Sequence, residues 1–255
     1  MKAIVLAGER PGGNALAAAT GVPAGVLAPV AGRPSIVRVI ETLRAAHGID
    51  GGVVAGPDPA VCRGSATLGA IFESGDFSWI EPDRGPAEST LRALDAIDEF
   101  PVLLTTGDHA LLTAPTVERF LAAAPPDTDA LVGLVSRERV MRRFPGTRRT
   151  LLRFREGSYC STNLFLLMSP KARGAVRFWP QVQRDRKRPW RIAGQLGAGT
   201  LLRYLGGRLA MDDAFAVLSR VMGCKVSWVE VDDELAAVDV DTVQDLALAE
   251  QVLGC

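Results

Sequence analysis

Three aspartates in this sequence are candidates for binding a divalent cation. Asp108 follows the apolar run of residues 101–106, which has the character of a buried parallel strand. Asp239 and Asp241 flank Val240, so both side chains would point to one face of an extended segment. Mg²⁺ is held in proteins by few carboxylates, with water and substrate phosphates as its other ligands. The three aspartates therefore predict a magnesium site, provided that the fold brings residues 108 and 239–241 together.

Each of these aspartates also has a purely structural interpretation. Asp108 would form an Asx turn or cap the helix that follows, and its neighbour His109 is expected at the surface of the loop. Asp239 would be an exposed strand end, and Asp241 would begin the closing helix, which Thr242 caps under either interpretation. Open α/β sheets bind ligands beyond the carboxyl ends of their strands, which favours a binding role for Asp108.

The N-terminal segment has the composition of a phosphate-binding loop. Residues 2–7 form a short apolar run that ends at Gly8, and a stretch rich in Gly, Pro and Ala follows. Glycines let backbone N–H groups approach an anion closely, and arginine offers a charged fork to phosphate oxygens. Arg10 and Arg33 lie near the two ends of this stretch. A phosphate-bearing ligand is therefore expected here, with an ordinary surface loop as the alternative.

Two further polar positions stand out against apolar surroundings. Gly85-Pro86 with Ser89 opens a helix after a strand and would present N–H groups and a hydroxyl to a base or a phosphate. Helix initiation alone explains this pattern nearly as well. Asn163 interrupts the apolar run 161–168, and a buried amide requires partners. It either ties down backbone or contacts a ligand.

The elements that would position these residues alternate between strand and helix as far as residue 135. Apolar runs predict strands at residues 2–7, 52–56, 77–80, 101–106 and 131–135. Apolar residues at helical spacing predict helices over residues 59–72 and after residues 34, 86 and 114. Such alternation is typical of a parallel sheet covered by helices on both faces.

The second half of the chain has a different pattern. Residues 137–149 are expected to form a basic loop with six arginines, and the apolar runs 151–154 and 161–168 predict a hairpin or a mixed-sheet insertion. A late strand is expected at 225–231, before the closing helix. We therefore predict one three-layer α/β/α domain over residues 1–255, with a mostly parallel sheet and a substrate-covering insertion at 136–230.

Composition argues against several classes of protein. Hydrophobic residues make up 47% of the 255, so a large core can be buried. Lys+Arg and Asp+Glu balance at 29 each, which argues against a chain dominated by nucleic-acid binding. No apolar run approaches the roughly 18 residues of a membrane span, and no signal peptide is expected. The four cysteines lack CxxC spacing and are expected to be reduced thiols of a cytoplasmic protein.

Six segments carry a family resemblance when they are taken in chain order: IVLAGERPGG, PVAGRP, GPAES, LLTTGDHAL, STNLFLL and VDVDTVQDL. Together they resemble the nucleotidyltransferases of the GT-A-like type. The nearest group contains the molybdenum-cofactor guanylyltransferase (MobA-like NTP transferases) and related small-molecule cytidylyl- and guanylyltransferases. The resemblance covers nearly the whole chain.

The resemblance implies transfer of a nucleoside monophosphate from a nucleoside triphosphate to a phosphorylated small-molecule acceptor, with release of pyrophosphate. It implies that Asp108 and Asp241 hold Mg²⁺, that Asp239 assists them, and that Asn163 faces the acceptor. Arg10 and Asp108 would be the catalytic residues. The nucleotide would be lined by Leu6, Ala7, Gly8, Arg10, Gly85 and Ser89.

One position departs from the family pattern. The family usually carries a lysine shortly before the GRP segment, where this chain has Gly25, and that lysine neutralises phosphate charge as pyrophosphate leaves. Either Arg10 and Arg33 compensate together with magnesium, or the activity is weak or altered. Two alternatives stay open. One is a GT-A glycosyltransferase using a sugar nucleotide, which would show an aspartate pair where this chain has Asp108-His109, and the other is a non-catalytic nucleotide-binding protein.

The segment 181–209 is the part that the resemblance explains least. Basic residues surround Trp190, namely Arg184, Arg186, Lys187, Arg188 and Arg191. Such a segment could dock on an anionic membrane, but five glycines between residues 194 and 207 argue against a long amphipathic helix. We expect this segment to cover the acceptor site or to contact a second copy in a homodimer, with lipid contact less favoured.

Overall fold

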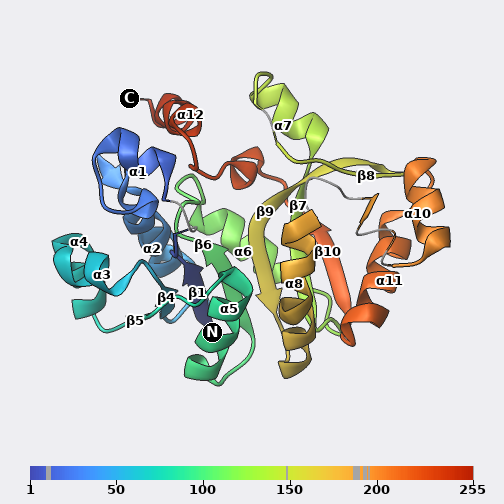
Figure 1. Cartoon of the computed structure of the whole chain (residues 1–255), viewed down its shortest axis with the longest axis horizontal. Coiled ribbons are helices and arrows are strands. Elements are labelled where there is room, and N and C mark those ends of the chain that lie inside the picture. The colour runs from blue at the N-terminus through green and yellow to red at the C-terminus, as the bar shows by residue number, and fades with distance from the viewer. Residues whose placement is uncertain (10–12, 148, 186–189, 192–193, 195, 255) are drawn as a thin grey trace.

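A computed structural model describes residues 1–9, 13–147, 149–185, 190–191, 194 and 196–254. Its centre is one sheet with the strand order β10-β7-β9-β6-β1-β4-β5, in which β8 pairs with β9 (Figure 1). The strands are β1 (Lys2–Leu6), β4 (Gly52–Ala55), β5 (Phe77–Ile80), β6 (Val102–Thr106), β7 (Ala130–Ser136), β8 (Leu152–Phe154), β9 (Gly157–Leu167) and β10 (Val226–Glu230). The short strands β2 (Pro29–Val30) and β3 (Arg33–Pro34) form a separate antiparallel pair.

Most neighbouring strands run parallel, and one strand reverses the direction. β1 pairs in parallel with β4 and β6, β4 with β5, and β7 with β10. β9 is antiparallel to both of its neighbours, β6 and β7. The mostly parallel α/β prediction is confirmed. β9 belongs to the expected insertion at 136–230, yet it lies inside the sheet, and the division into one domain with an insertion stays a prediction.

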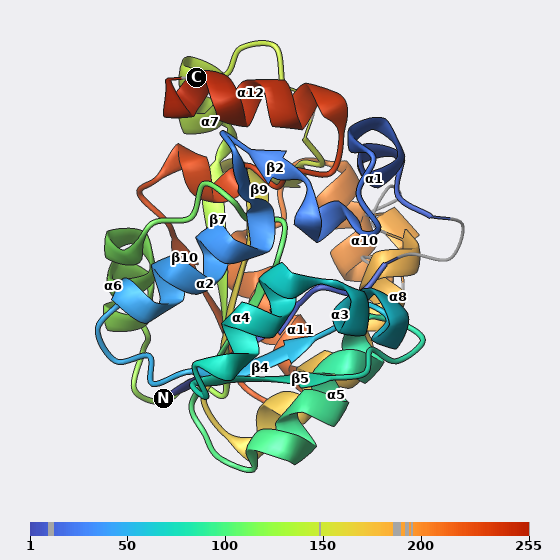
Figure 2. The ribbon, with the colours of Figure 1, turned by 90° about the vertical axis from the view of Figure 1, so that its left-hand side faces the viewer.

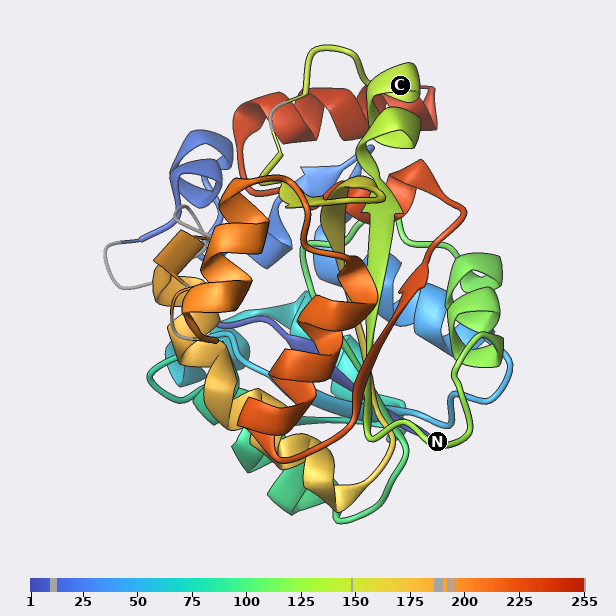
Figure 3. The ribbon, with the colours of Figure 1, turned by 90° about the vertical axis from the view of Figure 1, so that its right-hand side faces the viewer.

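Helices cover both faces of the sheet (Figures 2 and 3). One core cluster includes residues of α2 (Ser35–Ala45), α4 (Ala66–Glu73), α6 (Ala114–Ala122) and α12 (Val243–Leu253). The other includes residues of α5 (Pro86–Ile97), α8 (Arg173–Asp185) and α11 (Met211–Met222). The remaining described helices are α1 (Ala15–Thr20), α3 (Pro59–Gly64), α7 (Arg137–Arg143) and α10 (Ala198–Leu205). Within the described ranges, no helix has both the length and the apolar character needed to cross a membrane.

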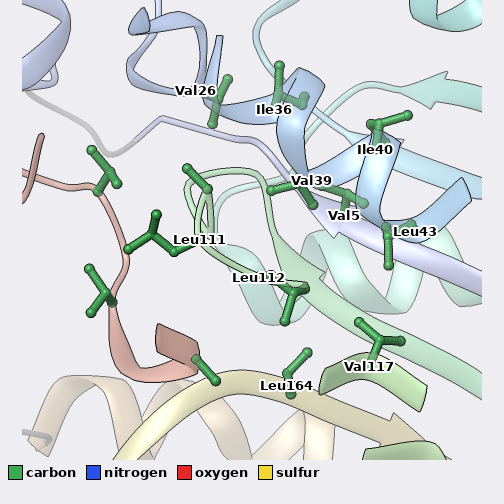
Figure 4. Packing of buried hydrophobic residues seen from close by; sticks show 14 of the residues in the cluster. Val5, Val26, Ile36, Val39, Ile40, Leu43, Leu111, Leu112, Val117 and Leu164 are labelled. Atoms are coloured by element: carbon green, nitrogen blue, oxygen red, sulfur yellow. The ribbon is translucent and has the colours of Figure 1, made fainter. Parts of the chain in front are cut away.

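The apolar runs of the sequence form the middle layer because the central strands are buried on both faces. In β1, Ala3 and Val5 pack in the first cluster, whereas Ile4 and Leu6 pack in the second. Figure 4 shows Val5 beside Val39 of α2. Side chains alternate between the two faces of a strand, so a strand covered on both sides has no polar positions. This explains why β1 reads as an unbroken apolar run.

Two predictions of local structure were wrong. The helix expected over residues 59–72 is divided into α3 and α4, because Ser65 caps α4 and its Oγ accepts a hydrogen bond from the N–H of Leu68 at 3.3 Å. The basic loop expected at 137–149 begins as a helix, α7. Val140 anchors α7 in the core, and Arg142 pairs with Glu138 one turn earlier at 2.9 Å.

A substitution in β6 tests this arrangement. Leu104 is 1% exposed in a strand that lies between β1 and β9. We expect Leu104→Ala to lower the free energy of unfolding by about 2–5 kcal/mol, because the truncation leaves a cavity in a packed core. Leu202→Ala is the control, since Leu202 is 70% exposed and its loss should cost under about 0.5 kcal/mol. Urea denaturation measures both, and equal values would contradict the central place of β6.

Candidate active site

The carboxyl ends of β1 and β6 are joined directly. The N–H of Gly107 donates to the carbonyl of Leu6 at 2.8 Å, which extends the pairing of the two strands by one residue. The carbonyl of Gly107 in turn accepts a buried hydrogen bond from Ser35 Oγ at 2.9 Å. Asp108 therefore begins its loop beside the first loop, which starts at Ala7 and Gly8.

The loops after β4 and β5 reach the same place. Gly56 has a φ of +103°, and a Cβ on it would lie 2.6 Å from the backbone nitrogen of Gly8. Only glycine permits this backbone to approach so closely. A Cβ on Gly8 would in turn lie 3.3 Å from Cβ of Pro82, in the loop that leads to Gly85. The predicted nucleotide positions Leu6, Ala7, Gly8 and Gly85 thus lie at one edge of the sheet, where β1 ends and the loops begin.

The C-terminal segment brings the other two aspartates to Asp108. The N–H of Val240 donates to the carbonyl of Asp108 at 3.0 Å, so residues 239–241 run past the loop after β6. Beyond them, Thr242 caps α12 and accepts a hydrogen bond from the N–H of Asp245 at 3.2 Å, which confirms the predicted cap. Figure 1 shows α12 and α7 at the same end of the sheet. The three predicted carboxylates are therefore neighbours.

Asp108 has an unusual acidity in this setting. The pKa of its carboxyl is raised to about 7, first because burial penalises the charged form and second because the carboxylate of Asp241 repels that charge. A hydrogen bond between the two carboxyl groups acts in the same direction. The hydroxyl of Thr106 donates to Asp108 Oδ1 at 2.5 Å and opposes the shift without cancelling it. A cation between Asp108 and Asp241 would relieve this repulsion.

Asp239 is turned to a different partner. Its Oδ1 lies 2.5 Å from Nη1 of Arg149, and Nη2 of the same arginine lies 2.8 Å from Oδ1 of Asp245. Burial raises the pKa of Asp239, and Arg149 acts against this shift. In the part of the chain that the structure describes, no three His, Cys, Asp or Glu side chains converge to hold a metal among themselves. A site for Mg²⁺ would thus depend on two carboxylates together with substrate oxygens.

His109 is buried, so the prediction that it lies at the surface was wrong. Its side chain is 1% exposed, and its Nδ1 lies 3.4 Å from the hydroxyl of Thr105. Burial lowers the pKa of His109 to about 4, so the ring is neutral at physiological pH. The loop after β6 folds back over the core and encloses the histidine.

Ser89 fixes the loop that precedes α5. Its buried Oγ accepts a hydrogen bond from the N–H of Asp83 at 2.9 Å, and its own N–H donates to the carbonyl of Gly85. Gly85 is the N-cap of α5, and Pro86 occupies the first turn. Helix initiation therefore accounts for this motif in the structure. A nucleotide contact by Gly85 or Ser89 stays a prediction.

Asn163 lies in a bulge of β9. The pairing of β7 with β9 shifts between Val132 and Leu134, and Asn163 takes a left-handed φ of +51°. Phe165 pairs with Leu104 of β6, so Asn163 lies toward the end of β6 that leads to Asp108. A residue with positive φ within a strand is typical of such a bulge. The register with β6 supports the prediction that Asn163 lies near Asp108.

Comparison with known proteins identifies the family. The MobA-like NTP transferase domain matches residues 3–196, which is most of the chain. The chain belongs to this family. The nucleotidyltransferase resemblance predicted from the sequence motifs is therefore confirmed.

Individual relatives agree with this assignment. A hypothetical transferase from Thermus thermophilus is 35% identical in sequence, and the match covers 96% of this chain and 98% of that one with a TM-score of 0.77. The 4-diphosphocytidyl-2C-methyl-D-erythritol synthase of Anaerococcus prevotii is 14% identical over 100% of this chain and 96% of its own, and a TM-score of 0.59 shows the shared fold.

A curated relative matches only in part. The bifunctional protein GlmU of Sinorhizobium fredii is 37% identical over 92 residues, which are 35% of this chain. This chain therefore spans only 20% of the length of GlmU.

The position of the family lysine is closed in this MobA-like chain. Gly25 is buried in the turn Gly25–Leu27, and a Cβ on it would lie 2.7 Å from Cγ of Asn14. Asn14 cannot withdraw freely, because its side chain caps α1 by accepting from the N–H groups of Leu16 and Ala17 at 2.9 and 3.1 Å. Glu9 Oε1 also accepts a hydrogen bond from the Gly25 N–H at 2.6 Å. The first loop is thus folded around a glycine.

Arg10 and Arg33 were the two arginines expected to compensate for the missing lysine, and the structure describes only Arg33. Arg33 is directed to Glu41 of α2, with Nη1 at 2.8 Å from Oε2. Arg10 lies outside the described residues. The missing charge is therefore not replaced by Arg33 in this conformation.

The basic segment around Trp190 is described in part. Arg186, Lys187 and Arg188 lie outside the described residues. Arg184 and Arg191 lie on either side of the buried carboxylate of Asp185, at 3.8 and 3.6 Å. Trp190 is exposed. A role of the segment in covering the acceptor, in a dimer contact or in lipid contact stays a prediction.

Two residues at this edge were missed by sequence reasoning. Ser35 follows the GRP motif directly, and a hydroxyl at the first position of a helix was an available signal. Arg149 offered no signal, because it stands 90 residues before Asp239 and 96 before Asp245. Only the fold reveals that contact.

Replacing Gly25 tests the closed position. Gly25→Lys would insert a side chain against Asn14, so we expect a loss of about 1–3 kcal/mol in the free energy of unfolding and no gain in nucleotidyl transfer. Gly64→Lys is the matched control, because a Cβ there meets open space. Thermal unfolding and turnover are measured on both. A Gly25→Lys variant that keeps its stability and turns over faster would show that Asn14 yields.

The raised pKa of Asp108 predicts a pH-dependent stability. Between about pH 4 and 7 the folded protein holds a proton on Asp108 that the unfolded chain has released, so this group's contribution is lost as pH rises through about 7. Asp108→Asn removes the titration. In EDTA we expect the variant to have a higher Tm than the unsubstituted protein at pH 8, and this advantage to shrink at pH 5.

The control for this measurement is Asp98→Asn, an exposed position in left-handed backbone that asparagine tolerates. It should leave the Tm difference between pH 5 and pH 8 unchanged. An Asp108→Asn variant with the same pH profile as this control would contradict the burial and repulsion described for Asp108.

Proposed function

We propose that this chain transfers a nucleoside monophosphate from a nucleoside triphosphate to a phosphorylated small-molecule acceptor and releases pyrophosphate. The observation that carries the proposal is the pairing of Asp108 with Asp241 beside the first loop. The hydrogen bond from Gly107 to Leu6 ties Asp108 to that loop, and the one from Val240 ties it to Asp241. Family membership supports a nucleoside triphosphate as the donor. The two aspartates beside the first loop support transfer that depends on a divalent cation.

Asp108 and Asp241 are the residues that would hold Mg²⁺. Carboxylate oxygens suit this hard cation. Burial and then the charge of Asp241 raise the pKa of Asp108, and a bound cation would offset both effects. When bound there, Mg²⁺ would offset the negative charge on the phosphate oxygens. Asp239, which the sequence suggested as an assistant, is held by Arg149 at 2.5 Å.

In this reaction the protein mainly positions the two substrates and neutralises phosphate charge, and it forms no covalent bond to either of them. An acceptor phosphate oxygen would attack the α-phosphorus in line with the departing pyrophosphate, with no covalent intermediate. The backbone of Leu6, Ala7 and Gly8 would hold the triphosphate, and the loop that Ser89 fixes before Gly85 would face the base. Asn163, presented by the bulge of β9, would face the acceptor. Arg10 is proposed for the phosphates on its sequence position alone.

A second candidate is nucleotide binding without turnover. It is favoured by the replacement of the family lysine with Gly25, whose N–H is already occupied by the carboxylate of Glu9. The glycosyltransferase alternative loses support, because the residue after Asp108 is the buried, neutral His109 and no aspartate pair stands there. The cytoplasmic location and the absence of a nucleic-acid partner remain predictions.

The proposal is tested by pyrophosphate release from a panel of nucleoside triphosphates and phosphorylated acceptors, with Mg²⁺ or with EDTA. We expect pyrophosphate release that depends on both Mg²⁺ and an acceptor. Asp108→Asn should lower kcat about 100-fold or more, because it removes one of the two carboxylates proposed to bind the cation. Asp98→Asn serves as the control and should retain turnover. Tight binding of a triphosphate by calorimetry, with no release for any acceptor, would favour the second candidate instead.

A further inference from the structure

Arg149 connects two carboxylates across a long stretch of sequence. It lies between α7 and β8, while its partners Asp239 and Asp245 lie before and within α12. The guanidinium uses one terminal nitrogen for each carboxylate, at 2.5 and 2.8 Å. Its side chain is only 12% exposed, so this is not a solvated surface pair.

The pair with Asp245 is a fixed support. The second oxygen of Asp245 accepts a hydrogen bond from Thr242 Oγ1 at 2.6 Å, and its backbone N–H donates to the same hydroxyl. Asp245 is therefore held in the first turn of α12 by the helix cap. Arg149 is held by Asp245, and its other terminal nitrogen then determines where the carboxylate of Asp239 points.

This arrangement decides how the charge of the site is distributed. Asp108, Asp239 and Asp241 act on one another electrostatically, so three neighbouring negative charges would otherwise share the space. The guanidinium of Arg149 compensates one of these charges, that of Asp239, while Asp108 and Asp241 are the predicted metal pair. This division matches Mg²⁺, which takes one or two protein carboxylates and fills its other positions with water and substrate oxygens.

We propose that Arg149 is a positioning residue that reserves Asp239, so that Asp108 and Asp241 alone bind the divalent cation. The inference rests on the proposed function only for the identity of the metal pair. It also connects the two sides of the site, because the segment that carries Arg149 leads into the hairpin of β8 and β9, where Asn163 lies.

Direct contact between Arg149 and substrate phosphate is the competing interpretation. Both terminal nitrogens already contact carboxylates, and Nε is buried without a hydrogen-bond partner in the described structure. The guanidinium is thus enclosed on the side of α12. A phosphate contact would affect KM for the triphosphate and leave metal binding alone, whereas a positioning role acts on the metal before any nucleotide is present.

The test measures Mn²⁺ binding to the substrate-free protein by the EPR signal of the free ion. Arg149→Met keeps the apolar stem but leaves Asp239 uncompensated, so a third carboxylate joins the site. We expect Mn²⁺ affinity to rise at least about tenfold, since an added negative charge within a few ångströms of a divalent ion is strongly attractive. Asp108→Asn should abolish binding in the same assay.

A double variant keeps the experiment decisive even if Arg149→Met folds poorly. Asp239→Asn combined with Arg149→Met removes both charges of the pair, so the net charge of the site is the same as in the unsubstituted chain. We expect its Mn²⁺ affinity to stay within about threefold of that chain, because the additivity of charges predicts cancellation. The control is Arg142→Met, whose side chain is 71% exposed and pairs with Glu138 on α7.

Three outcomes would overturn the proposal. The first is an unchanged Mn²⁺ affinity in a folded Arg149→Met variant. The second is a loss of tenfold or more in the double variant, which would make Asp239 a ligand. The third is a change confined to KM for the triphosphate, which would favour substrate contact. If instead Asp108→Asn leaves Mn²⁺ binding intact, the proposed metal pair itself is wrong, and this result is distinct from the other three.

Discussion

The repulsion between the carboxyl groups of Asp108 and Asp241 is the constraint on which the arrangement of this edge depends. Two neighbouring carboxylates in a partly buried place are unfavourable, and the pKa of Asp108 is raised first by its burial and then by the charge of Asp241. The contact persists because backbone groups enforce it. The N–H of Val240 bonds to the carbonyl of Asp108, and the N–H of Gly107 bonds to the carbonyl of Leu6 at the end of the β1–β6 pairing. Separating the two carboxyl groups would therefore break backbone hydrogen bonds. A sheet with two buried faces thus supplies the rigidity that holds like charges together.

The first loop shows how a family site adapts to a lost charge. At the position where the family resemblance implies a lysine, this chain has a buried glycine, whose side-chain space is taken by the amide of Asn14 and whose N–H donates to the carboxylate of Glu9. A larger side chain at position 25 would therefore have to displace the cap that Asn14 makes on α1. Glu9 adds a negative charge to a region expected to receive phosphates. Any triphosphate that binds there must compete with that carboxylate for the N–H of Gly25.

The antiparallel strand β9 gives the second half of the chain its role. It lies between two parallel strands, so the segment from residue 136 onward is part of the central sheet and not an appendage to it. Its bulge opposite Gly133 turns Asn163 into left-handed backbone. The same segment delivers Arg149 to the start of α12. The segment between β7 and β10 thereby contributes both the amide of Asn163 and the guanidinium of Arg149 to the edge of the sheet where the aspartates lie.

Much of the fold follows from local patterns in the sequence. The strands β1, β4 and β6 are apolar runs, since they are buried along nearly their whole length, and Asp108 follows β6 after one glycine. The cap at Thr242 is local as well, because its partner is three residues away. The family motifs are short segments of the same kind, so the resemblance identified Asp108 and Asp241 as candidate ligands from local sequence alone.

Only the tertiary structure decided the contacts that span the chain. The burial of His109 depends on how the loop after β6 folds back, and the helix α7 depends on a core site for Val140. The pairing of Arg149 with Asp239 joins residues 90 positions apart. Periodicity and turn chemistry act over a few residues, whereas the partner of a buried charge depends on which distant segment the topology brings beside it. For that reason the sequence predicted three carboxylates as possible ligands, and the structure separated them into a pair facing each other and one held by arginine.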